Sequence, residues 1–138
     1  MVIIITSRAA ERIADEILST NEEILAISII DQRKGNILVS KPKESFTKAF
    51  GVFQEGPKYG GSLAISALSI ANEVREIAGE AQSIITTYEK CKMMLLPIPS
   101  YEIVVGLVLQ RSVNAEDYNI GNTLEGLLLL SKEEEEER

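Results

Sequence analysis

The chain opens with apolar positions spaced as on one face of a helix. These positions recur every three or four residues and comprise Ala10, Ile13, Ala14, Ile17 and Leu18. Charged residues occupy the other face, so the spacing predicts an amphipathic helix, which Thr6 or Ser7 can cap at its start. The apolar residues 2–5 ahead of it are rich in β-branched side chains. They form either a disordered terminus or an arm that packs against the domain or a partner, and we expect the arm.

Two β-branched runs follow this helix, at residues 24–30 and 37–40. The polar stretch between them contains Gly35, which suits a turn with positive φ, so the two runs predict a β-hairpin. Pro42 is expected to end the second strand. Residues 43–61 are irregular and rich in glycine, and they hold all three phenylalanines of the chain. The phenylalanines lie at helical spacing, which predicts a short helix within this segment.

Three strands are predicted after a second long helix. Residues 62–78 carry a broad apolar stripe with many small side chains, which predicts a helix that packs against more than one neighbour and ends at Gly79. Residues 82–88, 91–96 and 102–110 have the composition of strands and are joined by short connections, as in an antiparallel meander. The last of them is apolar on both faces, as expected of a central strand.

A closing amphipathic helix completes the pattern. Asn114 is predicted to cap it, and its buried side is expected to comprise Leu124, Leu127 and Leu128. The elements together predict an α+β fold. Its five-stranded antiparallel sheet is built from the hairpin, a crossover helix and the three-strand meander, and helices flank it.

Length and charge bound the domain organisation. A chain of 138 residues is enough for one domain with one core. We assign residues 1–131 to this domain, with residues 1–6 as its apolar arm, and residues 132–138 to an acidic tail. Most of the formal net charge of −7 comes from the five glutamates at 133–137, which should be a solvated tail or a frayed helix end. The negative charge disfavours nucleic acid as a partner.

The composition also excludes several kinds of chemistry. The absence of histidine removes Ser-His and Cys-His nucleophile systems and His-ligated metals. Cys91 is the only cysteine, so an intramolecular disulfide is excluded and a reducing cytoplasm is expected. We find no apolar run of membrane-spanning length and no signal-peptide core, and we expect neither export nor membrane insertion. We therefore expect no enzyme activity, no metal and no cofactor.

The order of elements resembles the roadblock family of dynein light-chain-like proteins, within the longin and profilin-like folds. The resemblance spans about residues 7–130. It is carried by residues 24–31 and 35–39, by the alanine-rich helix, and by residues 95–99 before Tyr101. One departure is the segment 43–61, which is longer than is usual in roadblock proteins.

This resemblance implies a binding platform. In the family, the third strand lies at a sheet edge, and two chains pair these edges and pack their central helices together. The interface residues that this arrangement implies here are Leu68, Ala71, Ile84, Thr86 and Tyr88. The resemblance further implies a homodimer without hydrolytic chemistry that binds a small Ras-like GTPase or a larger scaffold.

A second reading places a small-ligand sensor in the segment 43–61. Its pocket would be lined by Phe46, Phe50, Phe53 and Tyr59. The competing interpretation is that these aromatic residues close one open end of the core.

Two further candidates have simple structural alternatives. Cys91 lies between two lysines, which favour a thiolate, but no base accompanies it. Gly60, Gly61 and Ser62 can present backbone N–H groups to a phosphate, with Lys58 nearby, but they lack the spacing of a P-loop. We expect an unreactive thiol and an ordinary helix start.

Overall fold

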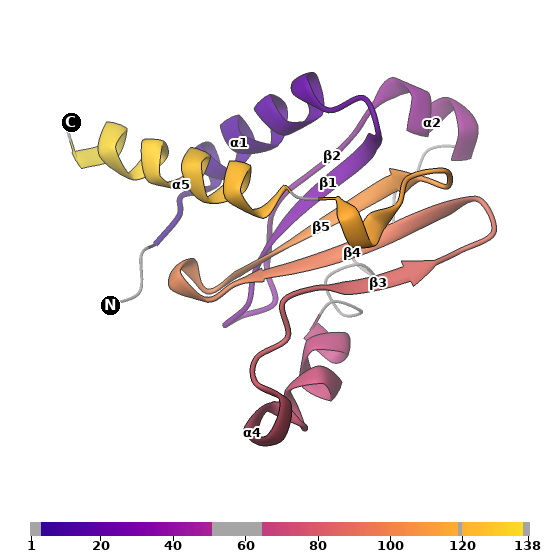
Figure 1. Cartoon of the computed structure of the whole chain (residues 1–138). Helices are drawn as coiled ribbons and strands as arrows, with labels where there is room; N and C mark the ends of the chain where they lie inside the picture. Colours follow the sequence, from indigo (N-terminus) through magenta and orange to yellow (C-terminus); the bar gives the residue numbers. More distant parts are fainter. Residues whose placement is uncertain (1–3, 51–64, 119, 137–138) are drawn as a thin grey trace.

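The computed structural model describes residues 4–50, 65–118 and 120–136, and it forms one sheet with helices on both faces (Figure 1). The helices are α1 (Ser7–Thr20), α2 (Glu44–Phe50), a helix at 65–72, α4 (Arg75–Ala78) and α5 (Gly121–Glu136). The strands are β1 (Ile24–Asp31), β2 (Ile37–Pro42), β3 (Ile84–Thr87), β4 (Cys91–Ile98) and β5 (Ile103–Gln110). Two short 3₁₀ turns lie at Pro99–Tyr101 and Ala115–Asp117.

The sheet has the strand order β2-β1-β5-β4-β3, and all neighbours are antiparallel. The chain leaves β2 at one edge, crosses through residues 65–78, and returns as β3 at the other edge. The hairpin, the meander, the central position of β5 and the edge position of β3 are therefore confirmed. Asp31 accepts the N–H of Gly35, whose φ of 71° closes the β1–β2 turn as predicted.

The main core lies between one face of the sheet and the helices α1 and α5, which lie together on that face in Figure 1. Thr6 caps α1, because its Oγ1 accepts a hydrogen bond from the Ala9 N–H at 3.1 Å. The periodicity predicted for α1 is confirmed, and its buried residues are Ala9, Ala10, Ile13, Ala14 and Ile17. From α5, Leu124 and Leu128 are buried in the same core and Leu127 is half-buried. We call this face of the sheet the core face.

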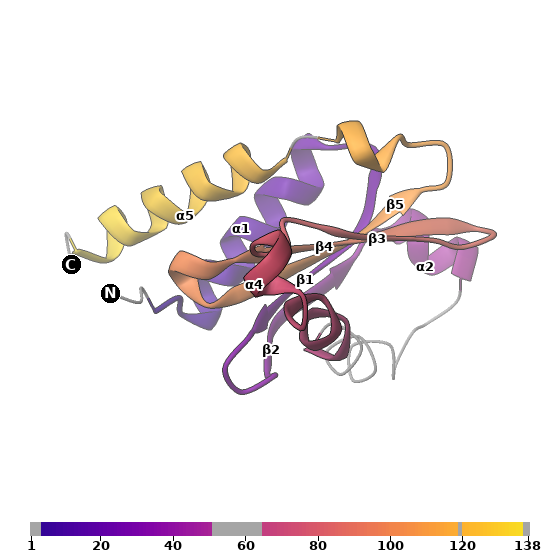
Figure 2. The same cartoon turned by 60° about the horizontal axis from the view of Figure 1, so that its bottom comes forward.

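The opposite face of the sheet, which we call the crossover face, is only partly covered. The residues of β1, β4 and β5 that alternate with the core positions point to it. In the middle of the sheet, Leu95, Gly106 and Ser28 lie on one rung across three strands. Residues 65–78, which we call the crossover segment, lie on this side, below the sheet in Figure 1 and in front of it in Figure 2.

Two predicted helices differ from the structure. The helix expected over residues 62–78 is not continuous, because Glu73 and Val74 form a turn between the helix at 65–72 and α4. The Glu73 N–H donates to Ile70 O, a tighter i→i−3 bond that ends the α-helical ladder there. Gly79 closes α4 with φ of 86°, as predicted.

The closing helix does not begin after Asn114. Residues 115–117 form a 3₁₀ turn, in which Asn114 donates its side-chain amide to Asp117 Oδ2 at 2.8 Å, and α5 starts only at Gly121. The helix then continues to Glu136, so residues 133–136 of the acidic run form the last part of α5. Ile5, in the predicted arm, is half-buried against the core, whereas Ile4 is exposed.

Candidate docking surface and adjoining cavity

Among the residues that the structure describes, no strand pairs with the outer edge of β3. The Tyr88 N–H donates to Cys91 O at 2.8 Å, so these two residues form a hydrogen-bonded pair of the β3–β4 ladder. Bonded and non-bonded pairs alternate in an antiparallel ladder. Ile85 and Thr87, which are opposite Met94 and Lys92, therefore direct their backbone N–H and C=O groups away from β4. These groups form a free template for another strand.

The two edges of the sheet differ in how they resist such pairing. At the other edge, β2 ends in Pro42 and carries Lys41, and its ladder with β1 is irregular between Ile29 and Ile30. Proline, lysine and bulges are devices that keep edge strands from pairing with other chains. The sequence of β3 is Ile-Ile-Thr-Thr, without a charge or a proline. Pairing with a second strand is therefore more favourable at β3.

The crossover segment exposes a row of large apolar side chains next to β3 in sequence. The exposed fractions are 69% for Ile70, 53% for Val74 and 91% for Ile77. Ile70 lies in the helix at 65–72, Val74 in the turn that follows it and Ile77 in α4, so each piece of the segment contributes one exposed apolar side chain. An apolar row of this kind is costly in water, since each fully buried side chain of this size contributes about 1.5–3 kcal/mol. A covering partner would recover part of this free energy.

The residues predicted for the dimer interface fall into two groups. Thr86 and Tyr88 are exposed at β3, and Ala71 and Ile84 are half-buried. Leu68 is only 3% exposed within the protomer, so it is not available at an outer surface. The predicted interface, with Leu68 as one of its residues, stays a prediction.

Sequence reasoning did not select Ile70, Val74 and Ile77 for the interface, although it placed them in the apolar stripe. The available signal is that apolar residues run nearly around this segment, which indicates neighbours on more than one side. The structure places Leu68 on the inner side and Ile70, Val74 and Ile77 on the outer side.

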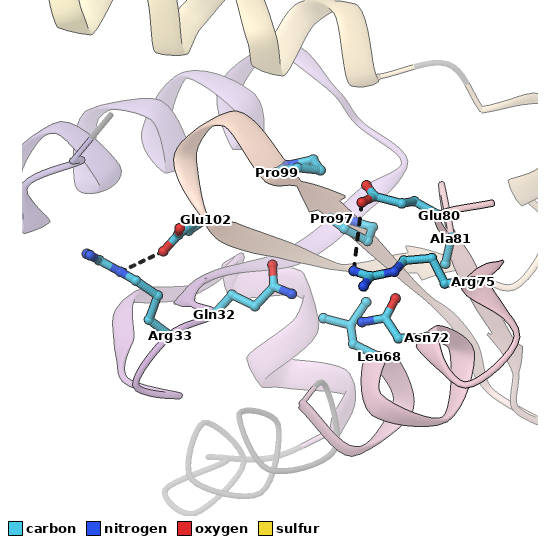
Figure 3. Close-up of a pocket in the computed structure, with 10 residues that line it drawn as sticks. All are labelled: Gln32, Arg33, Leu68, Asn72, Arg75, Glu80, Ala81, Pro97, Pro99 and Glu102. Carbon is cyan, nitrogen blue, oxygen red and sulfur yellow. Dashed lines mark ion pairs between the residues drawn. The ribbon is translucent and has the colours of Figure 1, made fainter. Parts of the chain in front are cut away.

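A cavity of about 360 Å³ lies on the inner side of the crossover segment (Figure 3). It is bounded by the β1–β2 turn, the crossover segment, the residues before β3 and the β4–β5 connection. The lining residues are Gln32, Arg33, Leu68, Asn72, Arg75, Glu80, Ala81, Pro97, Pro99 and Glu102. Phe46, the one residue of the predicted aromatic pocket whose side chain the structure describes, is not among them.

The aromatic pocket lies largely outside the described residues. Phe46 is half-buried in α2, which contacts β1. The side chain of Phe50 and the whole of Phe53 and Tyr59 are not described, and this pocket stays a prediction. Gly60, Gly61, Ser62 and Lys58 are outside the described residues as well.

The environment of Cys91 does not favour a reactive thiol. Burial raises the pKa of its thiol, opposite to the effect expected from the flanking lysines. Lys92 donates from Nζ to Val113 O at 2.6 Å, so its charge is held by a backbone carbonyl. Over the part of the chain that the structure describes, no three cysteine or acidic side chains cluster as metal ligands. Within the same ranges, no helix has the length and apolarity needed to cross a bilayer.

Comparison with known proteins finds similarity at the level of structure only. No protein-family model matches the sequence. No curated protein matches it either. The structure is similar to the gliding protein MglB from Thermus thermophilus, with a TM-score of 0.69 and 15% sequence identity, covering 97% of this chain and 96% of that one.

Two further solved structures are similar over most of both chains. An MglB with a tetrameric arrangement has a TM-score of 0.68 and 16% identity, and the match covers 96% of each chain. A roadblock/LC7 domain from Streptomyces avermitilis has a TM-score of 0.60 and 8% identity, with 88% of this chain and 91% of that domain covered. At these identities the similarity shows the fold. The predicted roadblock fold, an α+β domain within the profilin-like group, is thereby confirmed.

Proposed function

We propose that this roadblock-fold chain is a non-catalytic binding platform that works as a homodimer, with a regulatory or scaffolding role in the cytoplasm. The observation that carries the proposal is the open β3 edge together with the exposed row of Ile70, Val74 and Ile77. Residues 79–83 join the two directly, and Figure 1 places the crossover segment beneath β3.

A two-fold axis through the β3 edge would satisfy both features at once. Two antiparallel β3 strands would exchange the free N–H and C=O groups of Ile85 and Thr87, and would merge the sheets into one. The same axis would bring the crossover segments of the two chains to one side of the joined sheet. In such an isologous interface each contact occurs twice. A short edge strand and three apolar side chains from each chain therefore contribute twice to the free energy of association.

The sheet partner in this proposal is a second copy, and the regulated partner is a small Ras-like GTPase or a larger scaffold. The GTPase follows from the resemblance to roadblock proteins rather than from a feature of the described surface. The absence of histidine supports the non-catalytic part of the proposal, since the common nucleophile systems depend on this residue.

Light scattering across a concentration series tests the homodimer. The expected mass is twice the 15.2 kDa of the chain, falling toward one chain on dilution. Ile77→Glu should give a folded monomer, because Ile77 is 91% exposed in the protomer. Its melting temperature should match that of the wild type at concentrations where the wild type is also monomeric. Leu130→Glu is the matched control, since Leu130 is an exposed leucine on α5, at the core face. A wild-type monomer at every concentration, or a dimer that survives both Ile77→Glu and a blocked β3 edge, would exclude this interface.

Direct binding measurements test the partner class. A panel of purified small Ras-like GTPases, each loaded with GDP or with a non-hydrolysable GTP analogue, is passed over immobilised protein. We expect at least one GTPase to bind with an affinity that differs between the two nucleotides. If none binds, the scaffold remains the partner and the GTPase is excluded for that panel.

A further inference from the structure

The cavity on the inner side of the crossover segment has the size and chemistry of a small-molecule site. Its volume of about 360 Å³ is at the lower end of the range for ligand pockets, roughly 300–1,000 Å³. Leu68, Pro97 and Pro99 supply apolar wall. The other lining side chains are mainly charged groups and amides.

Charges in the lining are balanced in number and incompletely paired. Arg75 Nη1 lies 4.0 Å from Glu80 Oε1, which is beyond hydrogen-bonding distance. Arg33 Nε lies 2.9 Å from Glu102 Oε2 in a closer ion pair. The side chains of Arg75 and Glu80 are 57% and 61% exposed, so their remaining donors and acceptors face water, which a bound ligand would replace. Figure 3 shows the guanidinium of Arg75 between Glu80 and the side chain of Asn72.

Two amides in the lining, the half-buried Gln32 and the exposed Asn72, can also bond a ligand in place of water. Among the hydrogen bonds of the described residues, the side chains of Gln32 and Asn72 make none. Each amide supplies two donors and an acceptor. Gln32 is held in place by its backbone N–H, which donates to Glu102 O at 2.8 Å. Glu102 has a φ of 48°, a conformation that costs free energy in a non-glycine residue and occurs here in the cavity wall.

We propose that this cavity binds a small zwitterion, a free α-amino acid, whose carboxylate pairs with Arg75 and whose ammonium pairs with Glu80. A zwitterion can replace water at both groups at once, because its carboxylate complements Arg75 and its ammonium complements Glu80. A simple anion would bind Arg75 and leave Glu80 unpaired beside it, and a simple cation would do the reverse. The amides of Gln32 and Asn72 can bond the polar groups of the ligand, and the leucine and prolines contact its side chain.

The site does not depend on the proposed dimer. Leu68, Asn72 and Arg75 are spaced by four and three residues and line the cavity, while Ile70, Val74 and Ile77 are displaced by two residues and point outward. Two residues along a helix correspond to roughly 200° of rotation. Within the helix at 65–72, Ile70 therefore lies opposite Leu68 and Asn72, and within α4, Ile77 lies opposite Arg75. Ligand binding and self-association can therefore be measured separately.

Isothermal titration calorimetry of the full chain with each standard amino acid tests the proposal. At least one amino acid should bind, and the corresponding amine without the carboxylate and acid without the ammonium should bind at least about tenfold more weakly. Arg75→Ala and Glu80→Gln should each weaken binding by a similar factor. Arg111→Ala and Glu89→Gln are the matched controls, because both residues are exposed and lie outside the lining.

Three results would overturn the site. They are no heat with any amino acid, binding that survives both Arg75→Ala and Glu80→Gln, and an acid or amine that binds as tightly as the amino acid. Ile77→Glu separates the two proposals, since it should leave the amino-acid affinity unchanged whether or not the wild-type protein is a dimer. Melting curves of every variant confirm that a loss of binding is not a loss of folding.

Discussion

Ile84 lies directly opposite Leu95 in the β3–β4 ladder, and both side chains point to the crossover face of the sheet. This register fixes the direction of every backbone group in β3. Thr86, two residues on, bonds to β4 in the same way as Ile84, whereas Ile85 and Thr87 direct their groups outward. The edge can therefore be blocked without damage to the protomer.

Thr87→Pro should abolish the dimer while the protomer stays folded. Proline lacks the N–H that Thr87 directs outward, so no hydrogen bond within the sheet is lost. Thr86→Pro is the contrasting variant, because it removes an N–H that bonds to β4 and should lower the stability of the protomer itself. Light scattering and urea denaturation distinguish these effects. A Thr87→Pro protein that remains dimeric would show that the β3 edge is not the interface.

Much of the fold follows from local pattern. The continuous apolar run of β5 predicted a central strand, because both faces of that strand contact other groups. The spacing in α1 predicted its buried face for the same reason. The edge position of β3 came from the resemblance to a known fold, since the spacing of residues within a strand contains no information on strand order.

The predicted helices differ from the structure where a residue typical of a helix end forms a single turn instead. Asn114 carries a capping signal, but its amide bonds Asp117 and closes a single turn. Tyr118 then donates its hydroxyl to Asn21 Oδ1 at 3.2 Å, which ties the chain to the end of α1 before α5 begins. The break at Glu73 and Val74 leaves the apolar periodicity intact, so the pattern could not reveal it. The cavity combines four separate segments, which no local pattern places together.

Replacing two glycines by alanine should have opposite effects on stability. At Gly106, an added Cβ would lie 3.5 Å from Leu95 Cδ2, an ordinary contact, and the backbone has no positive φ. Gly106→Ala should raise the free energy of unfolding by about 0.4–1 kcal/mol, mainly through the unfolded chain. At Gly79, a φ of 86° strains any other residue, so Gly79→Ala should lower the free energy of unfolding by about 1–3 kcal/mol. Urea denaturation measures both, and equal effects of the two variants would contradict the backbone argument.

Two leucines of α5 should differ in their contribution to stability. Leu124 is fully buried in the main core, and Leu124→Ala should lower the free energy of unfolding by about 2–5 kcal/mol. Leu130 is exposed on the same helix, so Leu130→Ala should change it by less than about 0.5 kcal/mol. Thermal and urea unfolding are the measurements. A large effect of Leu130→Ala would indicate that this part of α5 is covered in solution.

The ion pairs between Lys41 of β2 and the acidic residues of α1 should make the free energy of unfolding depend on pH in the alkaline range. Lys41 Nζ lies 2.7 Å from Asp15 Oδ1 and 3.1 Å from Glu11 Oε1. Asp15, and then Glu11, raise the pKa of Lys41 above its ordinary value of 10.5. A raised lysine pKa means that the folded state holds the proton more tightly, so the stabilisation is complete below pH 10.5 and is lost as pH rises through the folded-state value.

The difference in melting temperature between wild type and Lys41→Gln should therefore be largest below pH 10.5 and shrink above it. Lys34→Gln, at an exposed lysine of the β1–β2 turn, is the control and should show no such trend. A wild-type advantage over Lys41→Gln that stays constant to higher pH would mean that the ion pairs do not stabilise the fold.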